Sequence, residues 1–379
     1  MSSDADLAAA LAGVEDPELG RGIVEVGMLR SAALAGSRAQ VLVALPSEGY
    51  QALAELEARI RRATEALPGV EGVDVEHTTM TADEQKALRV QLIGAPEASA
   101  GSQQAHGHAE GRAIPFADAA SHTRVLLVAS GKGGVGKSSV TTNLAIALAR
   151  LDKRVAVVDA DVWGFSIPRM IGVDRPPTVV DQMIVPPSSF GVRVISMGFF
   201  AREDQPVIWR GPMLHKALEQ FLTDVFWDDP DYLVIDLPPG TGDISLSLAQ
   251  FTPRGEVLIV TTPQPAAQKV AQRAAFMAEK VNLEVRGVIE NMSWFRGDDG
   301  TRYEIFGSGG GAELAARLDV PLIGQVPLVT SLREGGDTGR PIVVSEPEGE
   351  AARIFVEMAR TLDEELVPSR RYHPELKLI

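Results

Sequence analysis

Residues 131–138 read Gly-Lys-Gly-Gly-Val-Gly-Lys-Ser, and this octapeptide constrains the fold more than any other part of the chain. The apolar run at 124–130 predicts a buried strand before it, and the apolar spacing of 139–150 predicts a helix after it. A strand, a glycine loop and a helix in this order form a phosphate-binding loop, or P-loop. Four glycines let backbone N–H groups close around phosphate oxygens: Gly131, Gly133, Gly134 and Gly136. A glycine-rich turn that binds nothing is the alternative, and the flanking strand and helix disfavour it.

Two side chains at the end of the loop complete the expected phosphate site. Lys137 is expected to place its charge on the β- and γ-phosphates, and the Ser138 hydroxyl is expected to hold Mg²⁺. Lys132 is an additional charge that an ordinary P-loop does not need. The Lys-Gly-Gly-Val-Gly-Lys-Ser form resembles the deviant Walker A motif of the MinD, ParA and nitrogenase iron protein group. That resemblance implies that Lys132 reaches across a dimer to the partner's nucleotide, and a solvated surface lysine is the alternative.

The composition limits the class and the compartment of the protein. A chain of 379 residues exceeds the size at which one core stops growing, so we expect two domains. The net charge of −15 opposes binding to DNA or to anionic lipid. No run approaches the ~20 apolar residues of a membrane span, and the N-terminus lacks the positive segment of a signal peptide. We therefore expect a cytoplasmic protein that binds neither nucleic acid nor membrane. Without cysteine, the chain can form no disulfide and no thiolate metal site of its own.

A small α+β domain is predicted over residues 1–92. Its pattern is a short helix, two β-rich runs, an amphipathic helix and a final strand, at 4–14, 28–34, 39–45, 51–67 and 70–77. Residues 93–122 are rich in Ala, Gly, Ser, Gln and His, which bury little apolar surface, so a flexible linker is expected. The linker contains His106 and His108, and two ligands on a mobile segment would hold a metal poorly.

Residues 123–365 alternate short apolar strands with amphipathic helices. The strands are predicted at 124–130, 154–159, 232–236, 256–261, 286–290 and 321–325, with a helix such as 266–281 between them. This alternation predicts an α/β P-loop NTPase domain whose mainly parallel sheet is covered by helices on both faces, followed by a tail at 366–379. Ligands bind such folds at the carboxyl ends of the strands, which is where the P-loop lies.

Three aspartates follow predicted strands. Asp236 closes an apolar strand and resembles the Walker B acid that holds Mg²⁺ through water, and residues 240–243 would then sense the γ-phosphate. Asp159 and Asp161 flank the end of another strand, where the resemblance implies a metal-shell acid, Asp159, and an acid that orients the attacking water, Asp161. The assignment between these two stays open. Each aspartate is alternatively a helix N-cap or a turn residue.

Asn291 follows the strand that ends at Glu290, and its amide can pair with both a donor and an acceptor on adenine. A turn asparagine is the alternative. The residues expected to contact the nucleotide are Gly131, Lys132, Gly133, Gly134, Val135, Gly136, Lys137, Ser138, Ser139 and Asn291. The expected metal ligands are Ser138, Asp159 and Asp236, and the expected catalytic residues are Lys132, Lys137 and Asp161.

Several motifs together resemble the Mrp/ApbC iron-sulfur cluster carrier ATPases. They are the P-loop, Asp-Ala-Asp-Val-Trp-Gly-Phe-Ser-Ile-Pro-Arg at 159–169, Trp-Arg-Gly-Pro-Met at 209–213, Leu-Pro-Pro-Gly-Thr-Gly-Asp at 237–243, Glu-Asn-Met-Ser at 290–293 and Ile-Phe-Gly-Ser-Gly-Gly at 305–310. The resemblance implies a homodimer that hydrolyses ATP with Mg²⁺ and works with iron-sulfur assembly proteins or client apoproteins. A MinD- or ParA-like spatial regulator is the alternative, and the tail disfavours it because it has two prolines and no helical stripe.

The first ninety residues resemble the small assembly domain found ahead of some iron-sulfur ATPases. The resemblance rests on Asp-Pro-Glu-Leu at 16–19, Gly-Ile-Val-Glu-Val-Gly-Met at 22–28 and Leu-Pro-Gly-Val at 67–70. Where that family commonly has a cysteine after the second strand, residues 46–50 read Pro-Ser-Glu-Gly-Tyr. A docking role is therefore what remains for this domain. An ordinary turn is the alternative for Asp16-Pro17.

The carrier resemblance fails at the cluster ligands. The family usually carries Cys-x-x-Cys between the positions of Phe295 and Ile305, one pair from each protomer, but residues 296–300 read Arg-Gly-Asp-Asp-Gly. Gly297 and Gly300 stand about where the thiolates would be. Glycine offers no side-chain ligand, and aspartate oxygens are hard donors that suit a cluster poorly. We therefore expect an ATPase of the carrier family that does not hold an iron-sulfur cluster in the usual way.

Overall fold

The computed structural model describes residues 2–94, 114–162, 164–200, 211–240 and 243–368. The chain divides into two compact units. The first comprises residues 1–112, 175–187 and 224–228, and the second comprises residues 113–174, 188–223 and 229–379. Most of the expected linker and tail, at 95–113 and 369–379, lies outside the described residues. The predicted boundaries at 92, 122 and 365 therefore stay predictions.

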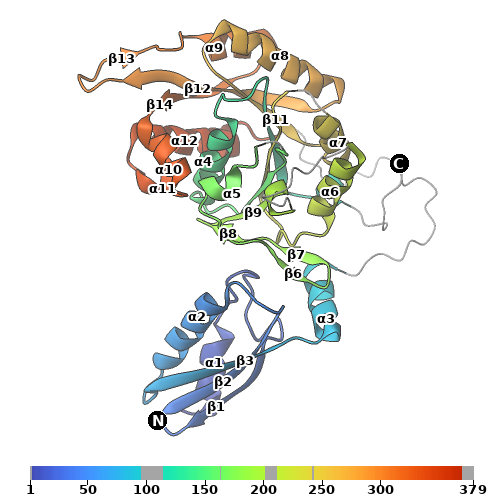
Figure 1. Ribbon diagram of the computed structural model, residues 1–379, viewed down its shortest axis with the longest axis vertical. Helices are drawn as coiled ribbons and strands as arrows, with labels where there is room; N and C mark the ends of the chain where they lie inside the picture. The colour runs from blue at the N-terminus through green and yellow to red at the C-terminus, as the bar shows by residue number, and fades with distance from the viewer. Residues whose placement is uncertain (1, 95–113, 163, 201–210, 241–242, 369–379) are drawn as a thin grey trace, which may run out of the picture. The chain divides into compact units, whose positions relative to one another are not determined.

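A three-stranded sheet forms the centre of the first unit (Figure 1). Its strands are β1 (Leu29–Ala35), β2 (Arg38–Leu45) and β3 (Gly72–Thr79), and β2 runs antiparallel to β1 and parallel to β3. The helices are α1 (Asp4–Ala12), α2 (Leu53–Glu65) and α3 (Ala82–Ile93), and β6 (Thr178–Val180) and β7 (Met183–Val185) add a hairpin. Ser3 and Thr81 start α1 and α3 with capping boxes, which satisfy the first free N–H groups. The small α+β domain is confirmed, and α3 is a helix that the sequence patterns do not predict.

The second unit is built on a larger, mainly parallel sheet (Figure 1). Its strand order is β13-β12-β11-β4-β10-β5-β9-β8, and β14 also pairs with β12. The strands are β4 (Arg124–Ser130), β5 (Val155–Asp159), β8 (Ser188–Ser189), β9 (Val192–Ser196), β10 (Tyr232–Asp236), β11 (Glu256–Thr261), β12 (Glu284–Arg296), β13 (Arg302–Tyr303) and β14 (Leu322–Leu328). The short strands β8 and β13 pair antiparallel with their neighbours, and the other pairs are parallel. The predicted fold class is confirmed.

Helices cover both faces of this sheet. The helices of the second unit are η1 (Pro115–Ala117), α4 (Lys137–Ala149), α5 (Ile167–Met170), η2 (Met197–Phe200), α6 (Gly211–Thr223), α7 (Asp243–Phe251), α8 (Pro265–Lys280), α9 (Gly310–Leu318), α10 (Thr330–Asp337), α11 (Ile342–Ser345), α12 (Glu350–Arg360) and η3 (Thr361–Glu365). Successive β4 side chains point to opposite faces, since Leu126 belongs to a buried cluster with α4 and α12, whereas Leu127 lies with Ala274 of α8. Burial on both faces explains the continuous apolar run of β4.

The predicted strands at 124–130, 232–236 and 256–261 agree with β4, β10 and β11 to the residue. The largest difference is β12, which continues to Arg296 instead of ending at 290. Its extension pairs with β13 across a hairpin, Phe295 opposite Tyr303 and Arg296 opposite Arg302. This pairing depends on residues after a glycine turn, so the apolar pattern of residues 286–290 alone does not predict the extension.

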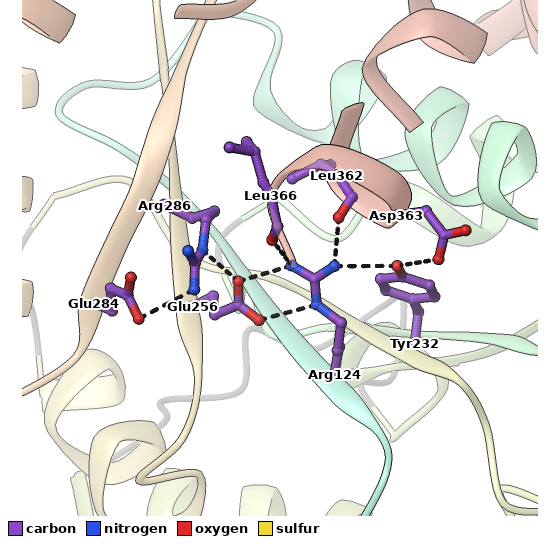
Figure 2. Close-up of polar contacts among 8 residues, drawn as sticks. All are labelled: Arg124, Tyr232, Glu256, Glu284, Arg286, Leu362, Asp363 and Leu366. Atoms are coloured by element: carbon purple, nitrogen blue, oxygen red, sulfur yellow. Dashed lines mark hydrogen bonds and ion pairs between the residues drawn. The ribbon is translucent and has the colours of Figure 1, made fainter. Parts of the chain in front are cut away.

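An ion-pair network around the buried Glu256 joins the amino ends of four strands in the second unit (Figure 2). Arg124, at the start of β4, donates two hydrogen bonds to the Glu256 carboxylate of β11, at 3.0 and 2.8 Å. Its other N–H groups donate to the Tyr232 hydroxyl of β10 and to two backbone carbonyls after α12. Arg286 of β12 donates to the same Glu256 carboxylate at 2.6 Å. The network ties this edge of the sheet, opposite the P-loop, to the end of the last helix.

The network predicts that Arg124→Met destabilises the second unit. Removing the guanidinium leaves Glu256, which is 4 % exposed, with Arg286 as its remaining partner in the network. We expect a loss of about 3 kcal/mol in the free energy of unfolding, the low end for breaking a buried pair. Urea denaturation measures it, with Arg150→Met at an exposed position as the matched control. Equal stability of the two variants would show that the network contributes nothing.

Candidate nucleotide-binding site

The loop between β4 and α4 has the backbone that a phosphate site requires. Gly136 precedes α4 with a φ of 80°, a left-handed conformation that favours glycine, and the helix begins at Lys137. At Gly131 an added Cβ would lie 2.2 Å from the backbone of Val270 in α8, so only glycine fits there. Leu237 and Gly240, which follow β10, donate backbone hydrogen bonds to Val128 and Ser130. The loop is thereby fixed at the carboxyl edge of the sheet, at the start of a helix whose N–H groups attract anions.

Asp236 is the centre of the site. It is the last residue of β10, between β4 and β5, and it is fully buried. Its Oδ2 lies 2.6 Å from the Ser138 hydroxyl, which donates to it, and 2.7 Å from Lys137 Nζ. The Thr141 hydroxyl donates to Oδ1 at 2.7 Å. Sequence reasoning missed Thr141, although its spacing of three and four residues from Ser138 and Lys137 places it on the same face of α4.

Asp159 ends the neighbouring strand β5, in register with Asp236. Its Oδ2 accepts hydrogen bonds from the Ser196 hydroxyl at 3.0 Å and from the Ile167 backbone at 3.3 Å, and its Oδ1 accepts one from the Asp161 backbone. Burial, and then the charge of Asp236, raise the pKa of Asp159 to about 7. Sequence reasoning missed Ser196, which belongs to β9 on the far side of β5. Its contact with Asp159 depends on a strand order that the sequence does not reveal.

Asp161 and Lys132 lie at the same edge of the sheet. Asp161 is 9 % exposed and follows Asp159 by two residues. Lys132 Nζ donates to the Gln264 side chain at 3.2 Å, just before α8, and the Lys132 backbone carbonyl accepts a hydrogen bond from the Ser130 hydroxyl. Of the predicted γ-phosphate sensor, Thr241 and Gly242 lie outside the described residues, as do Trp209 and Arg210 of the 209–213 motif.

Asn291 packs directly under the P-loop. Its Nδ2 donates to the Val135 carbonyl at 2.8 Å, and the residue is 2 % exposed. A Cβ at Gly136 would lie 2.2 Å from this nitrogen, which is a second reason for glycine there. Within the described part of the chain, Asn291 Oδ1 is a buried acceptor without a hydrogen-bond partner. The fold thus brings residues 131–139, Asp159, Asp161, Asp236 and Asn291 to one edge of the sheet.

The glycines at the start of α9 serve packing. Added Cβ atoms would lie 2.2 Å from the Pro263 carbonyl at Gly310 and 2.6 Å from the Glu290 side chain at Gly311. The Gly311 N–H donates to the fully buried Glu290 carboxylate, whose other oxygen accepts from Gln325 at 2.8 Å. Gly310 and Gly311 therefore let the start of α9 approach Pro263 and the middle of β12, and Gly311 supplies one of the hydrogen-bond donors to Glu290.

The parallel sheet, the P-loop and the carboxylate behind it define a P-loop NTPase. The sequence matches the ParA family, described as NUBPL iron-transfer P-loop NTPase, over residues 121–363, and the iron-sulfur cluster assembly protein family over residues 4–76. The chain belongs to the iron-sulfur cluster carrier family of P-loop NTPases, in agreement with the resemblance drawn from its motifs.

Relatives support this assignment over most of the chain. The iron-sulfur cluster carrier protein of Mycobacterium leprae is 45% identical over 92% of this chain and 90% of its own length. That of Deinococcus radiodurans is 41% identical over 93% of each chain. Among solved structures, the nucleotide-binding protein of Archaeoglobus fulgidus in complex with ADP is 36% identical, with a TM-score of 0.53 over 61% of this chain and 91% of its own. The MinD cell division ATPase of Pyrococcus furiosus is 25% identical, with a TM-score of 0.51 over 64% and 99%.

The hairpin between β12 and β13 does not fit an iron-sulfur cluster. A Cβ at Gly297 would lie 2.8 Å from the Tyr303 ring and 2.9 Å from the Asp299 carboxylate, and Gly300 has a φ of 80°. The Asp299 carboxylate accepts hydrogen bonds from the Thr301 backbone and hydroxyl. The turn is thus closed by its own contacts, and the donors it offers are carboxylates instead of thiolates. In the described parts of the chain, no three His, Asp or Glu side chains group as a metal site, and no helix is long and apolar enough to cross a membrane.

The raised pKa of Asp159 predicts a pH dependence of stability in the metal-free, nucleotide-free protein. The pKa of Asp159 is about 7 in the folded protein, whereas the ordinary pKa of an aspartate is 3.8. Proton binding by Asp159 therefore stabilises the folded protein fully below pH 3.8, and this stabilisation is lost as the pH rises toward 7. With a chelator present, the melting temperature should therefore fall more between pH 5 and pH 8 in the parent than in Asp159→Asn. Asp152→Asn, at an exposed position, should behave like the parent. Parallel profiles for the parent and Asp159→Asn would contradict this.

Proposed function

We propose that this protein is an ATPase that binds Mg²⁺·ATP at the carboxyl edge of its sheet. The observation that carries the proposal is the convergence of Lys137, Ser138 and Thr141 on the buried Asp236 carboxylate. A buried carboxylate held beside a P-loop hydroxyl is the arrangement in which Walker A and Walker B residues bind a metal-nucleotide complex. Lys137 pairs with Asp236 in this structure, and in the nucleotide complex its ammonium would serve the β- and γ-phosphates instead.

The Ser138 hydroxyl would hold the Mg²⁺ ion, Asp236 would hold it through water, and Asp159 would be a further acid of the metal shell. Bound there, Mg²⁺ neutralises charge that develops on the phosphates during hydrolysis. Asp161 is proposed to orient the attacking water, since it follows β5 at the same edge and is nearly buried. Residues 131–139 supply the backbone donors for the phosphate oxygens.

Asn291 is proposed to select the base. Its Nδ2 is engaged with the Val135 carbonyl, which leaves Oδ1 as the acceptor available to a ligand. Adenine offers an amino group to such an acceptor, whereas guanine presents a carbonyl oxygen at the corresponding position. A single buried amide would in this way link the base to the backbone of the P-loop.

We also propose that the protein acts as a homodimer in the cytoplasm, with iron-sulfur assembly proteins or client apoproteins as its partners and without nucleic acid or membrane. Family membership and the additional lysine of the P-loop support the dimer, in which Lys132 would contact the partner's nucleotide. The structural likeness to MinD is at the level of fold and P-loop, so the carrier-family interpretation stands over that of a spatial regulator.

Substitutions of the two P-loop lysines should impair ATP hydrolysis in different ways. Lys137→Ala removes the main cation of the γ-phosphate and should lower Mg²⁺-dependent ATP hydrolysis by at least about 100-fold. Lys132→Ala should retain nucleotide binding but lose hydrolysis and ATP-dependent dimerisation, because its role is in the partner's site. Lys280→Ala, an exposed lysine of α8, is the matched control.

Mixing Lys132→Ala chains with Asp161→Asn chains separates the role of Lys132 from that of Asp161. A lysine that acts in the partner's site and an aspartate that acts in its own site are lost from different sites of a mixed dimer. Undiminished turnover of Lys137→Ala would overturn the P-loop assignment. Parent-like hydrolysis by Lys132→Ala would overturn the action in trans.

Cluster reconstitution tests the mismatch at the hairpin. Anaerobic incubation with iron and sulfide should yield no stoichiometric cluster absorbance after desalting, because a cluster needs thiolate or imidazole ligands and residues 296–300 contain neither. ATP hydrolysis should persist in the same sample. A ferredoxin apoprotein reconstituted in parallel controls for the chemistry. A cluster that survives desalting at about one per dimer would contradict the prediction and require ligands from outside the hairpin.

A further inference from the structure

Two short pieces of the ATPase sequence belong to the first compact unit. Residues 175–187 and 224–228 group with residues 1–112, although the chain on either side of each piece belongs to the second unit. The β6–β7 hairpin lies in the first of these pieces. Its Val180, Met183 and Val185, with Phe226, share one buried apolar cluster with the N-terminal domain, and each is at most 2 % exposed. The hairpin is therefore part of the N-terminal domain's core.

Glu18 of the Asp-Pro-Glu-Leu motif makes one of the polar contacts between the domain and the hairpin segment. The Thr178 hydroxyl donates to Glu18 Oε2 at 2.7 Å, and Arg175 Nη1 lies 3.7 Å from Oε1. Glu18 is 3 % exposed, so its charge depends on these partners. Asp16 shapes the turn, because its carboxylate accepts hydrogen bonds from the backbone of Glu18, from Leu19 and from the Tyr50 hydroxyl. The motif is thus a turn, and the turn presents Glu18 to the hairpin.

The hairpin turn carries backbone strain at its contact with the domain. Asp181 and Gln182, between β6 and β7, have φ values of 42° and 70°. Two such residues make a type I′ turn, in which a non-glycine residue at the second position is unfavourable. Asp181 forms an ion pair with Arg89 of α3 at 3.3 Å, and Arg89 is 6 % exposed. Strain of this kind persists where surrounding contacts hold it, which here are contacts to the N-terminal domain.

The chain before the hairpin segment and the chain after it each donate a hydrogen bond to the same atom of the proposed nucleotide site, Asp159 Oδ2. Before it, the chain passes through Ile167 at the start of α5, whose N–H donates to Asp159 Oδ2. After it, the chain passes through β8 and β9 to Ser196, whose hydroxyl donates to the same Oδ2. A shift of Asp159 on nucleotide binding would therefore act on both stems of the segment that packs in the N-terminal domain.

We propose that the β6–β7 hairpin is an intramolecular docking site for the N-terminal domain, held by Glu18 and Thr178, through which that domain and the nucleotide site influence each other. The coupling rests on the proposed nucleotide site at Asp159, whereas the docking does not. Linkage requires the influence to be reciprocal: nucleotide binding changes the docking equilibrium, and docking changes nucleotide affinity by the same factor.

Spin labels test the docking in the full-length chain without nucleotide. Because the chain has no cysteine, Val24→Cys and Val179→Cys, at positions 48 % and 53 % exposed, can be labelled without background. The parent pair should give a narrow distance distribution. Thr178→Val and Glu18→Gln should broaden it, whereas Glu15→Gln, the same change at an exposed position of the same turn, should not. Should either variant fail to fold, Asp181→Asn, which preserves the turn and removes the charge facing Arg89, replaces it. If the distance distributions of Thr178→Val and Glu18→Gln are as narrow as that of the Glu15→Gln control, the proposed docking is overturned.

The coupling is measured with Mg²⁺ and a non-hydrolysable ATP analogue. The analogue should shift the parent distribution, and its Kd should differ at least about 5-fold between Glu18→Gln and Glu15→Gln. Equal Kd values with unchanged distributions would overturn the coupling. Failure of the analogue to bind the parent would instead overturn the proposed nucleotide site, and the coupling with it. The docking would still be decided by the nucleotide-free measurement.

Discussion

The site in the second unit depends on one buried carboxylate. Asp236 is inaccessible to solvent and is tolerable there because an ammonium and two hydroxyl groups of α4 surround it within 2.7 Å. The same contacts fix the first turn of α4 against β10 and therefore set the position of the P-loop that precedes it. A divalent cation could replace the Lys137 ammonium beside this carboxylate, and nucleotide phosphates would then be the anionic partners of Lys137. The polar interaction that fixes the start of α4 is thus the one that a bound nucleotide would rearrange.

A cluster carrier needs a nucleotide site and cluster ligands, and this chain has the residues of the first but not those of the second at residues 296–300. The described residues include the P-loop with its lysines and glycines, and Asp159 and Asp236 stand at the ends of β5 and β10. The cluster ligands are absent at residues 296–300, where glycine and aspartate close a tight turn. Arg296 and Arg302 pair with Glu350 at 2.8 and 3.0 Å and hold this hairpin against the start of α12. Family membership therefore agrees with the P-loop fold, whereas residues 296–300 do not supply the thiolate ligands of a cluster carrier.

Local patterns predicted the parts of the fold that local physics determines. The strands at β4, β10 and β11 followed from continuous apolar runs, and the P-loop followed from glycine spacing. Thr141 lay within reach of the same reasoning, since it shares a helix face with Ser138. Ser196 did not, because its contact with Asp159 requires knowing that β9 lies next to β5. The separation of residues 175–187 from their neighbours in sequence was equally hidden, since apolar residues in a short hairpin do not reveal which core they join.

Hydrogen–deuterium exchange, with and without Mg²⁺ and a non-hydrolysable ATP analogue, tests the central claim most directly. The analogue should slow exchange in the loop at 131–139, where phosphates would bind the backbone N–H groups, and in the segments after β5 and β10. The Arg124 network at the opposite edge of the sheet should be unchanged. Protection confined to that opposite edge, or none at 131–139 under conditions in which the analogue binds, would contradict the placement of the nucleotide around Asp236.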